Sequence, residues 1–113
     1  MLVRSVLAPS EEIILWGFSL GCYPTARLAG KGRFKGVVLQ SALASIYSLF
    51  VDDLSPYSTF SNDCFSVLEA VGSISCFLVI LHSREDEIVP FRHAEVLFER
   101  HRLVSSNPFC FLA

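Results

Sequence analysis

The chain has 113 residues, of which 52% are hydrophobic and 18% charged, with a net charge of −2 and a mean hydropathy of +0.51. This composition excludes intrinsic disorder, which needs low hydrophobicity and high net charge, and the small negative charge gives no basic field that would favour nucleic acid. The length fits one domain at most, yet the apolar content is high for a free-standing soluble domain, so we expect the interior part of a larger fold.

Membrane-spanning and exported proteins are also disfavoured. The longest charge-free stretches, residues 36–51 and 70–83, are shorter than the ~20 residues that a spanning helix needs. The apolar run at the N-terminus is too short for a signal peptide. Four cysteines without a CxxC pair favour neither a zinc site nor a disulfide framework, so we expect buried or incidental thiols in a reducing compartment. The sequence therefore predicts a cytoplasmic chain that is at most peripheral to membranes.

Three short apolar runs are candidate strands: residues 12–16, 36–41 and 76–82. None of them alternates polar with apolar residues. Continuous runs of β-branched and aromatic residues are typical of strands that are covered on both faces, as in a parallel sheet.

Helical patterns fill the gaps between these runs. Residues 20–29 are rich in helix-compatible types and are followed by Gly30, a candidate C-cap. Residues 44–51 and 63–71 could each form a short helix, and residues 52–62 are typical of a surface loop. A further helix is predicted from Pro90, because apolar residues recur there at helical spacing. The alternation of strands and helices predicts an α/β fold.

The first strand leads into Gly17-Phe18-Ser19-Leu20-Gly21, the G-x-S-x-G pattern of a nucleophile elbow. In such a turn the serine adopts a strained conformation between strand and helix, and the flanking glycines allow close approach of backbone. The backbone N–H of Leu20 would then supply half of an oxyanion hole. The alternative is a plain strand-to-helix connection with a serine N-cap.

A second group of polar residues, from His82 to Glu87, directly follows the third strand. A carboxylate at the C-terminal end of a parallel strand lies on the same sheet edge as the serine, where it could orient an imidazole. Alternatively, Glu85, Asp86 and Glu87 form a solvated acidic turn that leads into a helix.

Residues 13–21, I-I-L-W-G-F-S-L-G, followed by Pro24-Thr25, resemble the nucleophile segment of α/β-hydrolases. Within these, the chain is most similar to the palmitoyl-protein thioesterase branch, whose pattern is close to I-I-L-Y-G-Q-S-I-G-x-x-P-T. Residues 36–41 resemble the next strand of that family, and residues 77–100 resemble its V-L-I-I-H-G-T-E-D-E-V-I stretch and following helix. The resemblance implies Ser19 as the nucleophile and Asp86 as the acid of a Ser-Asp-His triad.

The resemblance also defines what the chain lacks. We expect residues 1–102 to be a partial α/β-hydrolase domain of about three strands, and residues 103–113 to be a tail unlike the family. The triad histidine should follow one further strand, whereas His93 and His101 fall in the last predicted helix and His82 ends a strand. We therefore expect three packing or surface histidines and no triad histidine. The isolated chain should be nearly inactive, and its uncovered strand edges should cause aggregation.

Three functions follow from these expectations. The first is part of a serine hydrolase that cleaves thioester or ester acyl bonds, with depalmitoylation of proteins as the reaction implied by the resemblance. The second is a catalytically dead remnant with at most a binding role, and the third is a peptidase or small-ester hydrolase of the same fold. In each hydrolase case the partner is an acylated protein or a small ester, with neither a cofactor nor a metal. Membrane association would belong to the parent protein and is not encoded in this chain.

Overall fold

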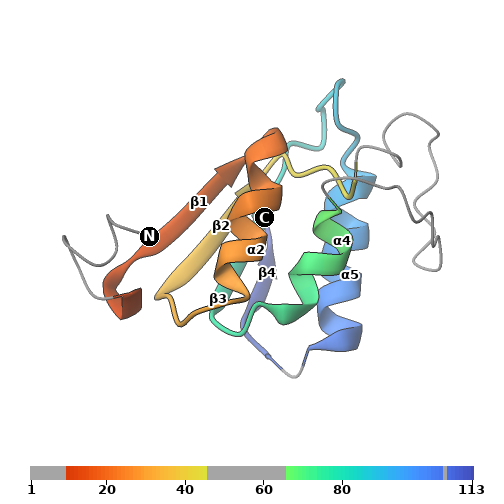
Figure 1. Ribbon diagram of the computed structural model, residues 1–113. Helices are drawn as coiled ribbons and strands as arrows, with labels where there is room; N and C mark the ends of the chain where they lie inside the picture. The colour runs from red at the N-terminus through yellow and green to blue at the C-terminus, as the bar shows by residue number, and fades with distance from the viewer. Residues whose placement is uncertain (1–9, 46–65, 106) are drawn as a thin grey trace.

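Four parallel strands form one sheet in the computed structural model, which describes residues 10–45, 66–105 and 107–113 (Figure 1). They are β1 (Ile14–Phe18), β2 (Gly36–Gln40), β3 (Phe77–Leu81) and β4 (Cys110–Leu112), paired in the order β1-β2-β3-β4. The α/β fold and the first three strands confirm the prediction, although β1 begins and ends two residues later than expected. The fourth strand was not predicted.

This fourth strand lies in the tail formed by residues 103–113. Leu78 of β3 donates its N–H to the carbonyl of Phe109 at 2.9 Å, which begins the pairing. Asn107 fixes the approach, because its side-chain N–H donates to the Cys76 carbonyl at 2.7 Å while its side-chain oxygen accepts from the Phe109 N–H at 3.1 Å. The tail therefore extends the sheet beyond β3 and leaves β1 and β4 as the edge strands of the described sheet.

The helices follow the predicted order. A short 3-10 turn η1 (Ser10–Glu12) precedes β1, and a second, η2 (Ser19–Gly21), leads from β1 into α2 (Cys22–Ala29). The helix α4 (Val67–Ala70) continues as the 3-10 turn η3 (Val71–Ser73), and α5 (Arg92–Val104) begins two residues after Pro90. The predicted helix at residues 44–51 falls largely outside the described residues, as does the predicted loop at residues 52–62 and the start of the helix predicted at residues 63–71.

Gly30 ends α2 as predicted, but a left-handed C-cap conformation is not the reason that glycine is needed at this position. Its φ is −73°, in the right-handed region that any residue adopts. A Cβ placed there would lie 2.9 Å from the Cβ of Ser73, which is closer than two carbon atoms can pack. The glycine is therefore needed for the close approach of α2 and η3.

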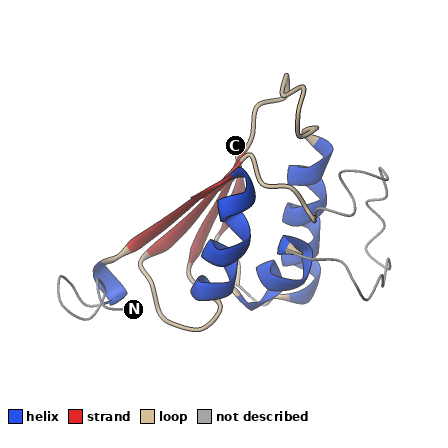
Figure 2. Ribbon diagram, turned by 45° about the horizontal axis from the view of Figure 1, so that its top comes forward, coloured by secondary structure: helices blue, strands red, loops and turns tan. Residues whose placement is uncertain are grey.

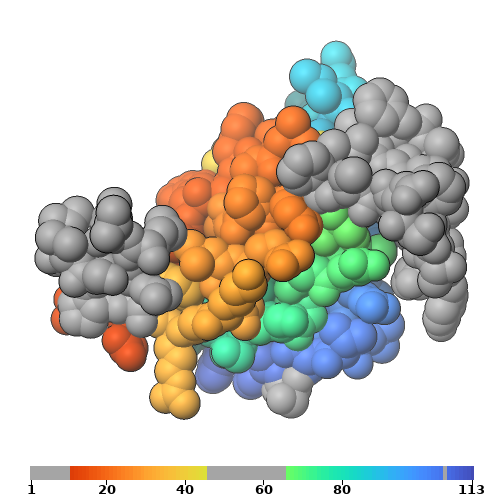
Figure 3. All heavy atoms as spheres, viewed as in Figure 1, coloured from red at the N-terminus to blue at the C-terminus, as the bar shows by residue number. Residues whose placement is uncertain are grey.

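All described helices of a full turn or more lie on one face of the sheet (Figure 2). The strand order causes this arrangement, because successive strands are added in one direction and right-handed crossovers then place every connecting helix on the same side. Figure 3 shows α2, α4 and α5 meeting in a continuous layer over that face. The opposite face carries no helix from the described residues.

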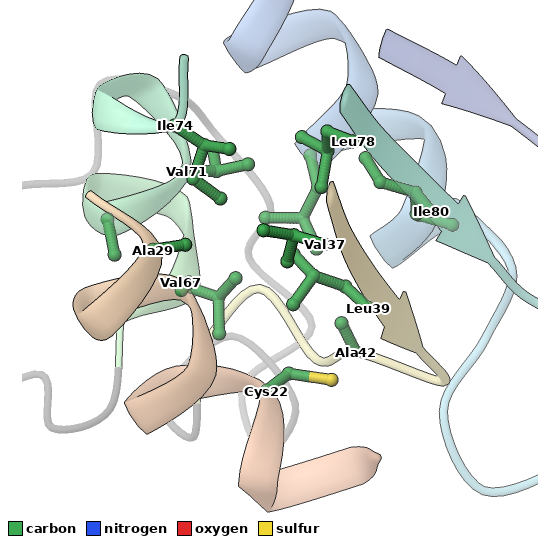
Figure 4. Packing of buried hydrophobic residues seen from close by; sticks show 14 of the residues in the cluster. Cys22, Ala29, Val37, Leu39, Ala42, Val67, Val71, Ile74, Leu78 and Ile80 are labelled. Atoms are coloured by element: carbon green, nitrogen blue, oxygen red, sulfur yellow. The ribbon is translucent and has the colours of Figure 1, made fainter. Parts of the chain in front are cut away.

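The hydrophobic core fills the space between the sheet and these helices (Figure 4). Strand residues that face the helices are buried, as are the residues of α2, α4 and α5 that face the sheet, and in Figure 4 the side chain of Cys22 points toward Ala42. The fully buried strand side chains are Val37, Leu39, Leu78 and Ile80. The core is thus one-sided, and it holds α2, α4 and α5 against that face of the sheet.

Candidate active site

Ser19 lies at the turn between β1 and α2, where the G-x-S-x-G pattern predicts it. Its φ is 54°, in the left-handed region that costs an L-residue about 1–2 kcal/mol. The preceding Phe18 is extended and the following Gly21 is right-handed, with φ values of −129° and −66°. The strain is therefore concentrated near the serine, where the chain changes from strand to helix, and strain of this kind is a pointer to function.

Close packing of α2 on β1 stabilises the turn. A Cβ at Gly17 would lie 2.6 Å from Thr25 Oγ1 and 2.9 Å from the Cα of Cys22, so no other residue fits there without a shift. Cys22 Sγ in turn donates to the Gln40 carbonyl at 3.4 Å, which ties the start of α2 to the end of β2. The close approach expected of both motif glycines is present at Gly17 but absent at Gly21, where an added Cβ would meet no atom within 4 Å.

Apolar residues flank the serine in the sequence. Phe18 on one side is 63% exposed, and Leu20 on the other is 54% exposed. Leu20 belongs to the 3-10 turn that opens the helical segment, and its backbone N–H is the first after the serine. The role of that N–H as an oxyanion donor stays a prediction, and the position of Leu20 at the start of a helical turn is compatible with it.

Asp86 lies in the turn that follows β3, seen at the top of Figure 1 in cyan. Its Oδ1 accepts two backbone hydrogen bonds, from the N–H groups of Ile88 and Val89, both at 2.9 Å. The hydrogen bond from Val89 is the largest cause that lowers the pKa of the Asp86 carboxyl. The bond from Ile88 and the nearby charge of His82 lower this pKa further, while burial opposes the shift. Asp86 is therefore held as a carboxylate by the fold.

The neighbouring acids have a different environment. Glu85 and Glu87 are exposed, whereas the side chain of Asp86 retains only 18% of its accessible surface. The solvated acidic turn considered above thus describes the two glutamates, and Asp86 is the acid that the turn encloses.

Ser19 and Asp86 lie at the same edge of the sheet without being in contact. Each follows the C-terminal end of its strand, and β2 separates β1 from β3. Two strand spacings amount to roughly 10 Å, a gap in which an imidazole could bridge the two side chains.

All three histidines of the chain are buried. His93 in α5 accepts a hydrogen bond on Nδ1 from the Ala44 N–H at 3.0 Å, and Nε2 of His101 lies 3.0 Å from the Ile74 carbonyl. Nε2 of His82 lies 2.6 Å from the Val89 carbonyl oxygen. All three histidines hydrogen-bond to backbone groups of other segments, as expected of packing histidines.

Solved structures of other proteins share this architecture. The esterase domain of a Rhodothermus marinus protein aligns with 99% of this chain and 51% of its own, with a TM-score of 0.72 and 18% identity. Pyrococcus horikoshii acylaminoacyl peptidase aligns with 99% of this chain and 20% of its own, with a TM-score of 0.71 and 16% identity. At such identities the likeness concerns the fold alone, and no protein-family model matches the sequence.

Curated proteins are also similar to this chain in sequence. The alpha/beta hydrolase domain-containing protein aho-3 of Caenorhabditis elegans is 33% identical over 92 residues, and the human alpha/beta hydrolase domain-containing protein 17B is 32% identical over 90 residues. These matches cover 81% and 80% of this chain. The chain belongs to the α/β-hydrolase superfamily. The matched region is only 27% and 31% of those two relatives, so this α/β-hydrolase chain spans less than a third of their length.

A second strained serine in this α/β-hydrolase chain escaped the sequence analysis. Ser41 follows β2 with a φ of 51°, and its N–H donates to the Leu81 carbonyl at 2.9 Å. Because Phe18 and Gln40 are register partners, Ser19 and Ser41 turn out of adjacent strands at the same level. The sequence offered only the end of an apolar run as a signal, and no residue pattern marks a left-handed serine there.

The environment of the described thiols disfavours the thiolate form. Burial raises the pKa of Cys22 to about 12 and that of Cys110 to about 11, and it also raises the pKa of Cys76. All three are free thiols, while Cys64 lies outside the described residues. Within the described ranges, no three His, Cys, Asp or Glu side chains gather as a metal site would require. The described helices also include none with the length and apolar character needed to cross a bilayer.

Proposed function

We propose that the chain is the part of a serine hydrolase that carries the nucleophile, Ser19, and the triad acid, Asp86. The observation that carries this proposal is the left-handed φ of 54° at Ser19, in a strand-to-helix turn on the same sheet edge as the enclosed carboxylate of Asp86. In this proposal the base is a histidine outside this sequence, because the three histidines present are buried in packing positions.

The reaction we propose is hydrolysis of a thioester or ester acyl bond. Ser19 Oγ attacks the acyl carbonyl as its proton passes to the imidazole, and the Leu20 N–H stabilises the oxyanion. The C–S or C–O bond then breaks, and the imidazolium returns the proton to the leaving thiol or alcohol. Water, activated by the same imidazole, hydrolyses the acyl-serine, and Asp86 holds the imidazole in one orientation throughout.

Acylated proteins are the substrate class that we propose, with a palmitoyl-cysteine as the first candidate. The exposed side chains of Phe18 and Leu20 beside the serine offer an apolar surface suited to an acyl chain. The resemblance of residues 13–25 to palmitoyl-protein thioesterases supports the same choice. Such a substrate fits a cytoplasmic location at the membrane surface.

The test is covalent labelling of the purified chain by a fluorophosphonate probe, with and without added imidazole to replace the base. The modified serine is identified by peptide mapping in a mass spectrometer. We expect slow labelling that imidazole accelerates, because loss of the general base costs on the order of 10⁶-fold in serine proteases such as subtilisin. The adduct should map to Ser19 and disappear in Ser19→Ala.

Ser41→Ala is the matched control, since Ser41 has the same left-handed conformation at the end of the adjacent strand. It should label as the unaltered chain does. Labelling spread over several serines, or Ser19 labelling that is unchanged in Asp86→Asn with imidazole present, would contradict the triad assignment.

A non-catalytic binding role is the second candidate, and the burial of all three histidines favours it. The same experiment separates the two. If no adduct forms at Ser19 even with imidazole and prolonged incubation, the chain has the hydrolase fold without an activated serine.

A further inference from the structure

His82, at the end of β3, lies directly against the turn formed by residues 83–89, which contains Asp86 and is called the acid turn below. The His82 side chain has no accessible surface, and its Nε2 is 2.6 Å from the Val89 carbonyl oxygen and 3.5 Å from Asp86 Oδ2. The ring of Phe91 meets it edge-on, with ring centroids 5.9 Å apart. The imidazole thus touches the carboxylate and also the residue whose N–H binds that carboxylate.

The hydrogen-bond chemistry fixes which nitrogen carries the proton. A carbonyl oxygen only accepts, so a contact of 2.6 Å with Val89 requires a hydrogen on Nε2 whether His82 is neutral or charged. The other ring nitrogen, Nδ1, is buried and has no hydrogen-bond partner among the residues that the structure describes. The ring nitrogen that forms a hydrogen bond is therefore Nε2, which faces Val89 and Asp86.

We propose that His82 is a positioning residue for the acid: its Nε2–H closes the turn from Asp86 to Val89 and attracts Asp86 Oδ2. Closure at the Val89 carbonyl keeps the Ile88 and Val89 N–H groups on Oδ1. Oδ2, the oxygen left without a backbone donor, then stays available to an incoming imidazole. The proposal rests on the proposed function only in naming Asp86 the triad acid.

A second histidine shows what a purely structural version of this contact looks like. His101 is also fully buried, and its Nε2 lies 3.0 Å from the backbone carbonyl of Ile74. Its Nδ1 has no hydrogen-bond partner in the described ranges of the chain. Within the described part of the chain, it forms no ion pair with a carboxylate. His101 therefore matches His82 in burial and hydrogen bonding, and it differs from His82 in lacking the contact with a described carboxylate.

The other described charged groups in and beside the acid turn are solvent-exposed. Arg84, Glu85 and Glu87 belong to the turn itself and Arg92 to the first turn of α5, and all four are exposed. The guanidinium of Arg84 lies over the ring of Phe91 at 4.5 Å. Water screens such groups, so His82 is the buried partner that acts on the carboxylate.

The experiment is a carbon-13 NMR titration of the Asp86 carboxyl in the full chain, with amide hydrogen exchange at Ile88 and Val89. Four proteins are compared: unaltered, His82→Leu, His82→Gln and His101→Leu. In His82→Leu we expect the carboxyl pKa to rise toward its ordinary value and the two amides to exchange faster. His82→Gln keeps a donor near the Nε2 position and should preserve both properties.

His101→Leu should lower the unfolding free energy while leaving the Asp86 titration unchanged. The proposal fails if His82→Leu leaves the titration and both amides as they were, or if His101→Leu changes them equally. Should His82→Leu not fold, the nitrogen-15 shifts of His82 in the unaltered chain decide, because a proton on Nδ1 instead of Nε2 would overturn the proposal. None of these readouts uses catalysis, so a failure of Ser19 to label would remove the proposed function and leave this result standing.

Discussion

The two faces of the sheet differ sharply, although the same strands build both. On the helix side, Leu39, Leu78 and Ile80 are completely buried. On the other side, Trp16, Phe18 and Phe111 remain 51–63% exposed. The register shows that this second face also includes Ile14, Val38, Gln40, Phe77, Val79 and Leu81, and none of its strand residues is charged.

This difference shows where the candidate site gets its rigidity. Gly17 faces the helices and packs against α2, while Phe18, the next residue, faces the open side. Ser19 follows at the edge where the two faces meet. Among the described residues, the strain at the serine is therefore supported from the helix side, and the other face of the sheet, called the bare face below, carries no helix.

Truncating a side chain on the two faces should have very different costs. Leu39→Ala removes a fully buried side chain and should lower the unfolding free energy by about 2–5 kcal/mol. Phe77→Ala removes a larger side chain that is 52% exposed on the bare face, and it should cost no more than about 1 kcal/mol. Denaturant unfolding followed by circular dichroism measures both. Equal losses would mean that the bare face is covered in solution.

The two motif glycines sharpen the same comparison at the site. Gly17→Ala would push a Cβ against Thr25 and Cys22 and should cost about 1–3 kcal/mol in unfolding free energy. Gly21→Ala meets open space at a φ of −66°, so it should be neutral or stabilise by up to about 1 kcal/mol. If both substitutions destabilise equally, α2 does not pack on β1 as described.

Sequence reasoning found the parts of this site that depend on local pattern. The apolar runs located three strands, and the G-x-S-x-G pattern placed Ser19 at the strand-to-helix turn where the structure has it. The expectation of strands covered on both faces concerns the larger parent fold and stays a prediction; within the described residues, the order of the strands puts every connecting helix on one side.

What the sequence did not reveal depends on contacts between distant residues. The strand β4 has only three residues, and it is held by the bonds from Asn107 to Cys76 and Phe109, which no periodicity displays. The first predicted strand stops at residue 16, whereas β1 continues through Gly17 to Phe18, and the close packing of Thr25 requires a glycine at that position. The contact of His82 with Asp86 depends on a turn shape that the residue types alone leave open.

The bare face should also drive association of the chain. A charge placed there must be desolvated when two faces meet, so Trp16→Glu should weaken self-association by about tenfold, or ~1.4 kcal/mol. Ile88→Glu is the control, because Ile88 is 81% exposed but lies in the acid turn, outside the sheet. Light scattering over a concentration series measures the effect. An equal response to both variants would indicate that association is not specific to the face.

The smallest expected effect concerns the acid turn and pH. The lowered pKa of Asp86 means that its carboxylate stabilises the fold at pH values above the ordinary aspartate pKa of 3.8, and this contribution is lost as the pH falls through the lower pKa of the folded state. Asp86→Asn should therefore be less stable than the unaltered chain at neutral pH, by no more than about 1 kcal/mol because the group is partly solvated. The difference should shrink in acid, whereas Glu87→Gln, in the same turn but exposed, should show a smaller difference at any pH. Urea unfolding of the three proteins between neutral and acidic pH measures this, and a difference that grows in acid would reverse the sign assigned to Asp86.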